Sequence, residues 1–301
     1  MLCGFHAMGQ TLAELEKELD SMIRRTEKSD FVLGLAYGNN PAYDKRNNTY
    51  ATQDLVLKPY LSPSLTYYHK SGLNAGVSTY YLFNANDKPW FEWDLNAGYD
   101  YTKNRRFLTG INYTKYLFTN SRKDIMATPI TNELFAYFTY RNWWLQPALS
   151  ADFGWGREKD QVSRKEYSVI HGQDINFIAS LRHDFMFLDV VRHNDAFLLV
   201  PSVNFTAGTA NYYSELESFE YLMQSARGRR TLPKPAAPLT RQRPADITTG
   251  FEARAVDVSL HLSYIIGRVT VAPSYTVFKL LTASQGNGLS GFFTAHMSVT
   301  L

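Results

Sequence analysis

The chain has 301 residues, enough for one large all-β domain, and a formal net charge of only +3. A charge this small and this dispersed gives no indication of a nucleic-acid surface. No stretch approaches the run of about 18 apolar residues that a membrane helix needs. The 20 Tyr and 19 Phe favour strands and interfacial aromatic girdles instead.

Residues 1–9 read as the end of a secretory signal, because Ala7 and Gly9 place small side chains at the −3 and −1 positions before Gln10. We expect the mature chain to begin at Gln10, and an ordinary cytosolic N-terminus is the alternative. Cys3 is the only cysteine and would leave with the signal. We therefore expect no disulfide, no thiolate metal site and no cofactor.

Residues 10–30 predict a short helix. Thr11 and Glu14 fit a capping box, and an apolar stripe at helical spacing follows, formed by Leu12, Leu15, Leu19 and Met22. Such a helix would lie in the periplasm, act as a plug in the barrel mouth or contact a partner protein. A loosely packed helix without function is the alternative.

Residues 31–301 predict an all-β fold, a transmembrane antiparallel up-and-down β-barrel of about twelve strands. In residues 90–102, Trp93 and Leu95 alternate with Glu92 and Asp94, which is the period of a strand. At about 3.3 Å per residue this strand can cross a tilted bilayer. The expected strands cover residues 31–38, 55–69, 73–85, 90–102, 106–118, 129–141, 144–156, 173–187, 196–209, 251–266, 268–281 and 290–301.

The connections between these strands alternate between short and long. Short ones are expected at 70–72, 103–105, 142–143, 189–194 and 267, and long ones include 39–54, 157–172 and 211–250. This rhythm is typical of outer-membrane barrels with periplasmic turns and extracellular loops, and an even strand count places both termini in the periplasm. Ten strands, or fourteen if 157–172 forms a hairpin, remain open. A soluble sandwich is disfavoured because its strands are usually only about 5–6 residues long.

Four of the strands share an apolar–x–Pro–x–apolar pattern at Pro63, Pro147, Pro201 and Pro273. Proline removes a donor from the ladder, so we expect a bend or a bulge there. Together with the signal ending and the amphipathic last strand, this pattern resembles Gram-negative outer-membrane β-barrels of the Bacteroidota over nearly the whole chain. The resemblance implies an outer-membrane location and a transport or porin-like role. Leu301 departs from the aromatic residue that usually ends such chains.

Twelve strands should enclose a narrow lumen that side chains fill in part. A passive channel for small, cationic solutes is the first functional hypothesis, with Glu92, Asp94, Glu133 and Asp152 as its constriction. If 142–143 is a two-residue turn, Glu133 lies opposite Asp152, and opposed like charges need a cation, a base or a proton. Polar filler paired with arginines is the alternative. The predicted pore-lining residues are Lys58, Glu92, Asp94, Asp100, Glu133, Arg141, Asp152, Arg182, Asp184, Asp257, His261 and His296.

An enzyme is the competing class, because outer-membrane phospholipases also use twelve-stranded barrels with Ser and His on the outer wall. Here His69 and His183 fall on the lipid-facing phase, but no serine motif accompanies either one. We therefore expect no catalysis. His261 and His296 lack ligand spacing, so no metal site is predicted.

The long connection 211–250 ends in a basic, proline-rich arm. It could contact lipopolysaccharide phosphates, an acidic ligand or the acidic lumen, and solvated disorder is the alternative. A structural or partner-binding barrel, acting through this loop or the N-terminal helix, is thus the second functional hypothesis. The arm carries Arg227, Arg229, Arg230, Lys234, Arg241 and Arg243.

Overall fold

The computed structural model describes residues 29–39, 41–43, 55–57, 59–83, 89–101, 103–104, 106–118, 130–161, 167–193, 195–209, 251–281 and 289–301. The predicted signal remnant, the N-terminal helix, Lys58 and the basic arm lie outside these residues. Within the described ranges, no helix is long and apolar enough to cross a membrane.

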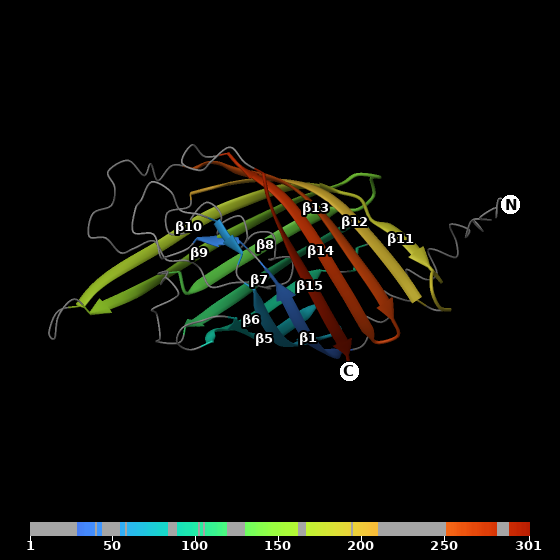
Figure 1. Cartoon of the computed structure of the whole chain (residues 1–301), viewed down its shortest axis with the longest axis horizontal. Helices are drawn as coiled ribbons and strands as arrows, with labels where there is room; N and C mark the ends of the chain where they lie inside the picture. The colour runs from blue at the N-terminus through green and yellow to red at the C-terminus, as the bar shows by residue number, and fades with distance from the viewer. Residues whose placement is uncertain are drawn as a thin grey trace.

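The described residues form one antiparallel sheet that closes on itself (Figure 1). Neighbouring strands pair in the order β10-β9-β8-β7-β6-β5-β4-β1-β15-β14-β13-β12-β11, and a further β10–β12 pairing completes the ring. The strands are β1 (Asp30–Gly38), β2 (Pro41–Tyr43), β3 (Leu55–Leu57), β4 (Tyr60–Tyr68), β5 (Leu73–Leu82), β6 (Trp90–Tyr101), β7 (Phe107–Phe118), β8 (Asn132–Tyr140), β9 (Gln146–Gln161), β10 (Tyr167–Arg182), β11 (Phe185–Leu188), β12 (Asp195–Gly208), β13 (Glu252–Ile266), β14 (Val269–Leu280) and β15 (Ser290–Thr300).

Three of these segments prolong others. The small β2–β3 pair keeps the register of β1 and β4, since Gly38 faces Tyr60 and Pro41 faces Leu57. In the same way β11 continues β10 along β12. The wall therefore has twelve strands, which confirms the predicted all-β barrel, and β15 lies beside β1 at the seam (Figure 1).

The two faces of the wall differ in chemistry, as a period of two requires. Outward side chains are apolar and exposed, including Leu33, Trp93, Leu149 and Val258. The inward side chains between them are mostly polar and buried. A belt of exposed apolar side chains around a closed barrel has the composition of a wall that contacts lipid.

Both described chain ends lie at the end of the barrel that carries the short turns. Leu301 N donates to Phe31 O, and Lys70 N in the β4–β5 turn donates to Ser29 Oγ. Trp143 and Trp144 are exposed in the β8–β9 turn at this same end. Their position is typical of an aromatic girdle at a membrane boundary.

Two predicted connections were wrong. The β9–β10 ladder continues as far as the pair Gln161 and Tyr167, so most of 157–172 is a hairpin and not a long loop. It prolongs two existing strands beyond their neighbours and adds none (Figure 1). The β8–β9 turn covers residues 141–145 and is not a two-residue turn at 142–143. Residue patterns locate strands better than they locate ends, because the ladder can continue past the lipid.

The four strand prolines lie on the outward phase, and the pairing lapses beside Pro201 and Pro273 without a shift of register. Opposite Pro201, the long strand formed by β10 and β11 breaks at His183 and Asp184. The β13–β14 pairing similarly lapses beside Pro273. Within the described ranges the two register shifts lie elsewhere, between Tyr80 and Tyr81 and between Thr206 and Ala207. A bulge at the prolines was therefore a wrong expectation, and a bend there stays a prediction.

The β11–β12 turn is held by one carboxylate. Asp195 is 2% exposed and accepts hydrogen bonds from the backbone N–H groups of Val190, Val191 and Arg192 at 2.7–3.0 Å. It also accepts the Tyr264 hydroxyl at 2.7 Å, which ties the turn to β13. An anion that accepts several charge-assisted bonds is a strong anchor for otherwise unpaired amides.

We predict that Asp195→Ala lowers the free energy of unfolding by about 2–3 kcal/mol, because the turn amides lose their buried acceptor. Tyr264→Phe, which removes one of these bonds, should cost about 1 kcal/mol. Urea unfolding of the barrel in lipid vesicles, followed by tryptophan fluorescence, measures both. Equal losses for the two variants would show that the turn amides do not depend on Asp195.

Candidate functional site

Five inward-facing carboxylates gather on four of the five neighbouring strands β6 to β10, in the half of the lumen nearer the long connections. We call them the carboxylate cluster. Each is at most 3% exposed, so each is nearly removed from solvent. They are Glu92 and Asp94 on β6, Glu133 on β8, Asp152 on β9 and Asp174 on β10.

The register differs from the predicted one. Glu133 faces Gly154, and Asp152 faces Phe135, so Glu133 and Asp152 are diagonal neighbours and not a directly opposed pair. The expectation was wrong because the β8–β9 turn is longer than two residues, which shifts the partner of every residue on β9. Gly154 instead lies between Glu133 and Asp174 in one row, since it also pairs with Asp174. Because residue 154 is a glycine, it contributes no side chain between these two carboxylates.

Neutral donors hold several members of the cluster in place. The hydroxyl of Tyr116 on β7 donates to Glu133 Oε2, and Tyr116 itself faces Asp94 across β6 and β7. Asn176 Nδ2 donates to Asp152 Oδ2 at 3.2 Å. These contacts orient carboxylate oxygens without neutralising their charge.

Buried aromatic side chains narrow the same half of the lumen. Tyr60 and Tyr80 lie with ring centroids 6.3 Å apart, and Phe278 and Phe292 lie 6.1 Å apart. With Tyr116 and Phe135 they form an inward aromatic collar in which every member is at most 4% exposed. The cluster therefore lies in a section of the barrel where large, buried aromatic side chains fill part of the enclosed space.

Asp100 lies at the other end of β6, away from the cluster. It accepts Asn74 Nδ2 at 3.2 Å and the Tyr137 hydroxyl at 2.5 Å. Tyr137 reaches it by crossing Gly110, where a Cβ would lie 2.6 Å from Asp100 Oδ1 and 2.7 Å from the ring. Only glycine at this position leaves room for the contact.

The other predicted lumen residues are distributed along the barrel. Arg182 and Asp184 form a long ion pair of 3.5 Å, and Arg141 follows β8 at the end with the short turns. Asp257, 1% exposed, accepts Asn204 Nδ2 at 2.6 Å and Ser259 Oγ at 3.0 Å. That any of these residues lines an open path stays a prediction.

His261 and His296 lie on β13 and β15, with β14 between them. His261 pairs with Ser274 and His296 with Ala272, so the two imidazoles occupy adjacent levels of the wall. Among the residues that the structure describes, no group of three His, Cys, Asp or Glu side chains could hold a metal ion.

Two lumen residues were missed by the sequence analysis. Asp174 has the same inward phase as Arg182. It was not counted among the pore-lining residues because it lies at the very start of the predicted strand 173–187. Arg254, 4% exposed, is the extra residue of the bulge opposite Thr206 and Ala207, where strict alternation fails. Its guanidinium donates to the carbonyls of Gly208 and Thr209 and pairs with Glu252.

His69, one of the two outer-wall histidines, contacts a serine in its own turn. Ser71 Oγ lies 2.8 Å from His69 Nδ1, so a serine is within hydrogen-bond reach of one of the two outer-wall histidines. Both residues lie at the exposed β4–β5 turn, and Ser71 N contacts the same ring nitrogen at 3.3 Å. Gly72, with φ of 99°, completes this turn. The geometry is that of a local turn bond between positions two apart.

His183 has a different environment, in which two aromatic side chains contact its ring. Trp144 lies 4.6 Å away and Phe185 4.3 Å away, centroid to centroid, and His183 Nδ1 lies 2.5 Å from Trp144 O. The ring thus belongs to the aromatic girdle beside the short turns.

Comparison with known proteins finds similar solved structures but no matching family model or curated protein. Similar solved structures include the NanC porin, with 8% identity, 89% of this chain and 100% of that chain covered and a TM-score of 0.43. The KdgM porin is 8% identical, with 89% of this chain and 99% of that chain covered and a TM-score of 0.42. An outer-membrane channel from Pseudomonas putida F1 is 10% identical, with 91% of this chain and 96% of that chain covered and a TM-score of 0.46.

Proposed function

We propose that this protein is a narrow, passive outer-membrane channel for small solutes, with a preference for cations set by the carboxylate cluster. The single observation that carries this proposal is the gathering of five desolvated carboxylates in one section of a closed barrel. The small number of strands and the aromatic collar both favour a narrow path.

Electrostatics gives the preferred charge of the solute. An ionised carboxylate that is removed from water is costly unless a positive charge compensates it, and neighbouring carboxylates increase that cost. A cation is attracted to a group of carboxylates, whereas an anion is repelled by it. Rings of Asp and Glu favour cations in channels for this reason.

The inner face beyond the cluster supports the same preference. Asp100 and Asp257 add further inward acids. Of the described inward bases, Arg182 pairs with Asp184 and Arg254 with Glu252, and Arg141 lies at the end with the short turns. The field inside the barrel is thus biased toward negative potential, which concentrates counter-ions.

The proposed orientation places the short turns and both chain ends in the periplasm. It is supported by the alternation of short turns with longer connections and by the shared location of Ser29 and Leu301. The carboxylate cluster then lies in the extracellular half of the lumen, where an entering solute meets it early.

Neutralising Glu133→Gln together with Asp152→Asn should lower the cation-to-anion permeability ratio. We expect a fall of roughly tenfold, the lower end of the counter-ion enrichment that a cleft lined by one charge produces. The measurement is the reversal potential of single channels in a planar bilayer under a potassium chloride gradient. Both replacements keep the side-chain shape, so the change reports charge.

The matched control is Asp100→Asn together with Asp184→Asn, which removes two inward acids outside the cluster. Its reversal potential should shift less than that of the Glu133 and Asp152 variant, because these two acids lie outside the cluster and each has a partner of its own, Tyr137 for Asp100 and Arg182 for Asp184. An unchanged reversal potential in the Glu133 and Asp152 variant would show that these acids only fill the lumen and do not set its selectivity. A purified, folded barrel without discrete conductance would overturn the channel itself and favour a structural or partner-binding barrel.

Orientation can be tested by labelling in a Cys3→Ser background. Leu289→Cys lies beside a long connection and is 75% exposed as leucine, so it should react with a membrane-impermeant maleimide on intact cells. Ser71→Cys, in the β4–β5 turn, should react only after the outer membrane is permeabilised. The reverse pattern would place the short turns outside the cell.

A further inference from the structure

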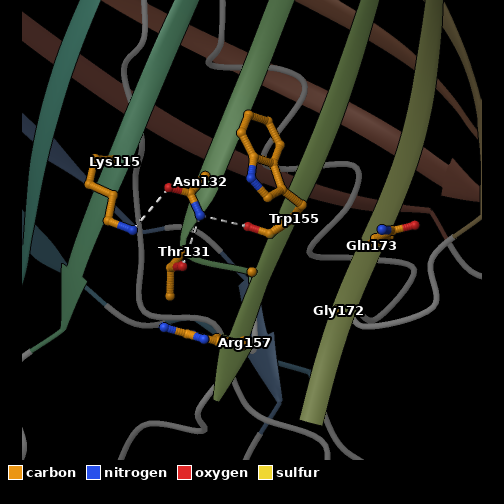
Figure 2. Close-up of a pocket in the computed structure, with 8 residues that line it drawn as sticks. Lys115, Thr131, Asn132, Trp155, Arg157, Gly172 and Gln173 are labelled. Atoms are coloured by element: carbon orange, nitrogen blue, oxygen red, sulfur yellow. Dashed lines mark hydrogen bonds between the residues drawn. The ribbon is translucent and has the colours of Figure 1, made fainter.

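A second site lies on the outer wall, away from the lumen. A pocket of about 320 Å³ opens between β7, β8, β9 and β10 near their ends at the long connections (Figure 2). Eight described residues line it, and none of them is acidic: Lys115, Thr131, Asn132, Trp155, Gly156, Arg157, Gly172 and Gln173.

Strand phase places the pocket's side chains outside the barrel. Lys115 lies between the buried, inward Thr114 and Tyr116, so it has the outward phase of β7. Gln173 alternates in the same way with buried Asp174 on β10. A lysine on the lipid-facing phase is unusual in a barrel wall, because charge there is costly except near the membrane surface.

One amide fixes the lysine. Asn132 Oδ1 accepts Lys115 Nζ at 2.9 Å and the Tyr113 hydroxyl at 2.8 Å. Its Nδ2 donates to Trp155 O at 3.2 Å and to Thr131 Oγ1 at 3.1 Å. Asn132 thus joins β7, β8 and β9 and leaves Lys115 with two further N–H donors.

Arg157 supplies a second cation from β9. In Figure 2 the Lys115 ammonium and the Arg157 guanidinium both lie around Thr131, with the Trp155 ring above them. A guanidinium and an ammonium without an acidic neighbour in the lining match the oxygens of a phosphate, which Arg can bind in bidentate fashion.

The surroundings of the pocket point to a lipid. The Trp155 ring packs with Tyr113 and Phe153, at centroid distances of 6.0 Å and 5.4 Å. Further along the same strands toward the middle of the wall, Ile111 and Leu149 are exposed and apolar. A cationic pocket directly above an apolar surface fits a molecule with a phosphorylated head and acyl chains.

We infer that this pocket binds a phosphate carried by a lipid of the outer leaflet, of the class of the phosphorylated glucosamine of lipopolysaccharide. Lys115 and Arg157 contact the phosphate, Asn132 positions Lys115, and the acyl chains lie on the apolar wall. The site requires the barrel to stand with its long connections outside the cell. It does not require the barrel to conduct.

Native mass spectrometry of the detergent-purified barrel with added diphosphoryl lipid A tests the inference. Lys115→Gln with Arg157→Gln should weaken binding roughly 30-fold. Each basic residue near an anionic lipid surface contributes about 1 kcal/mol of binding free energy, and the loss of two corresponds to this change in affinity. Lys103→Gln with Arg106→Gln, which removes two exposed charges near the short turns, is the matched control and should leave the affinity unchanged. The heat-induced band shift on a gel verifies that each variant is folded.

The lipid series separates the sources of the phosphate. Affinity should fall from diphosphoryl to monophosphoryl to dephosphorylated lipid A, and millimolar inorganic phosphate should not displace the lipid. Displacement by inorganic phosphate would make the pocket a site for a soluble anion and overturn the inference. Equal affinity for the three lipids would also overturn it. So would an unchanged affinity of the Lys115 and Arg157 double variant for diphosphoryl lipid A. If the double variant does not fold, Arg157→Gln alone, at an exposed position, decides between these outcomes.

Discussion

Backbone groups in a hydrocarbon layer have no water to bond, so each must find a partner on a neighbouring strand. The structure meets this constraint by pairing β1 with both β4 and β15 and by pairing β10 with β12, which leaves the wall without an open edge. Every other feature follows from closure. Closure fixes which face is enclosed, and only then can polar residues on that face meet one another across strands.

The enclosed face combines aromatic side chains and carboxylates. Aromatic rings such as Tyr60 and Phe278 fill volume, and the carboxylates lie among them with neutral donors such as Tyr116 and Asn176. These donors fix the direction in which the carboxylate oxygens point. The outer wall has the opposite arrangement, in which the cations Lys115 and Arg157 stand beside Trp155 at the membrane boundary.

Much of this fold could be predicted from the sequence, because a period of two directly reports which face each residue occupies. Alternation placed Glu92 and Asp94 inward and Trp93 outward, as the structure has them. Pairing between strands was harder, since it depends on turn length: the turn at 141–145 moved Asp152 from Glu133 to Phe135. Alternation also failed at Arg254, because a bulge adds one residue to one strand. The pocket around Asn132 could not have been predicted, since its residues come from four strands and meet only through the register.

The pairing of β1 with β15 has a consequence for how the molecule is made. Val32 faces Thr300, so the contact that completes the cylinder joins residues from nearly opposite ends of the polypeptide. Contacts between such distant positions form slowly, because a long stretch of chain must be ordered first. Until then the edge of the sheet stays unpaired and prone to aggregate. Biogenesis should thus depend on helpers that shield the unpaired edges of β1 and β15 until the two strands meet.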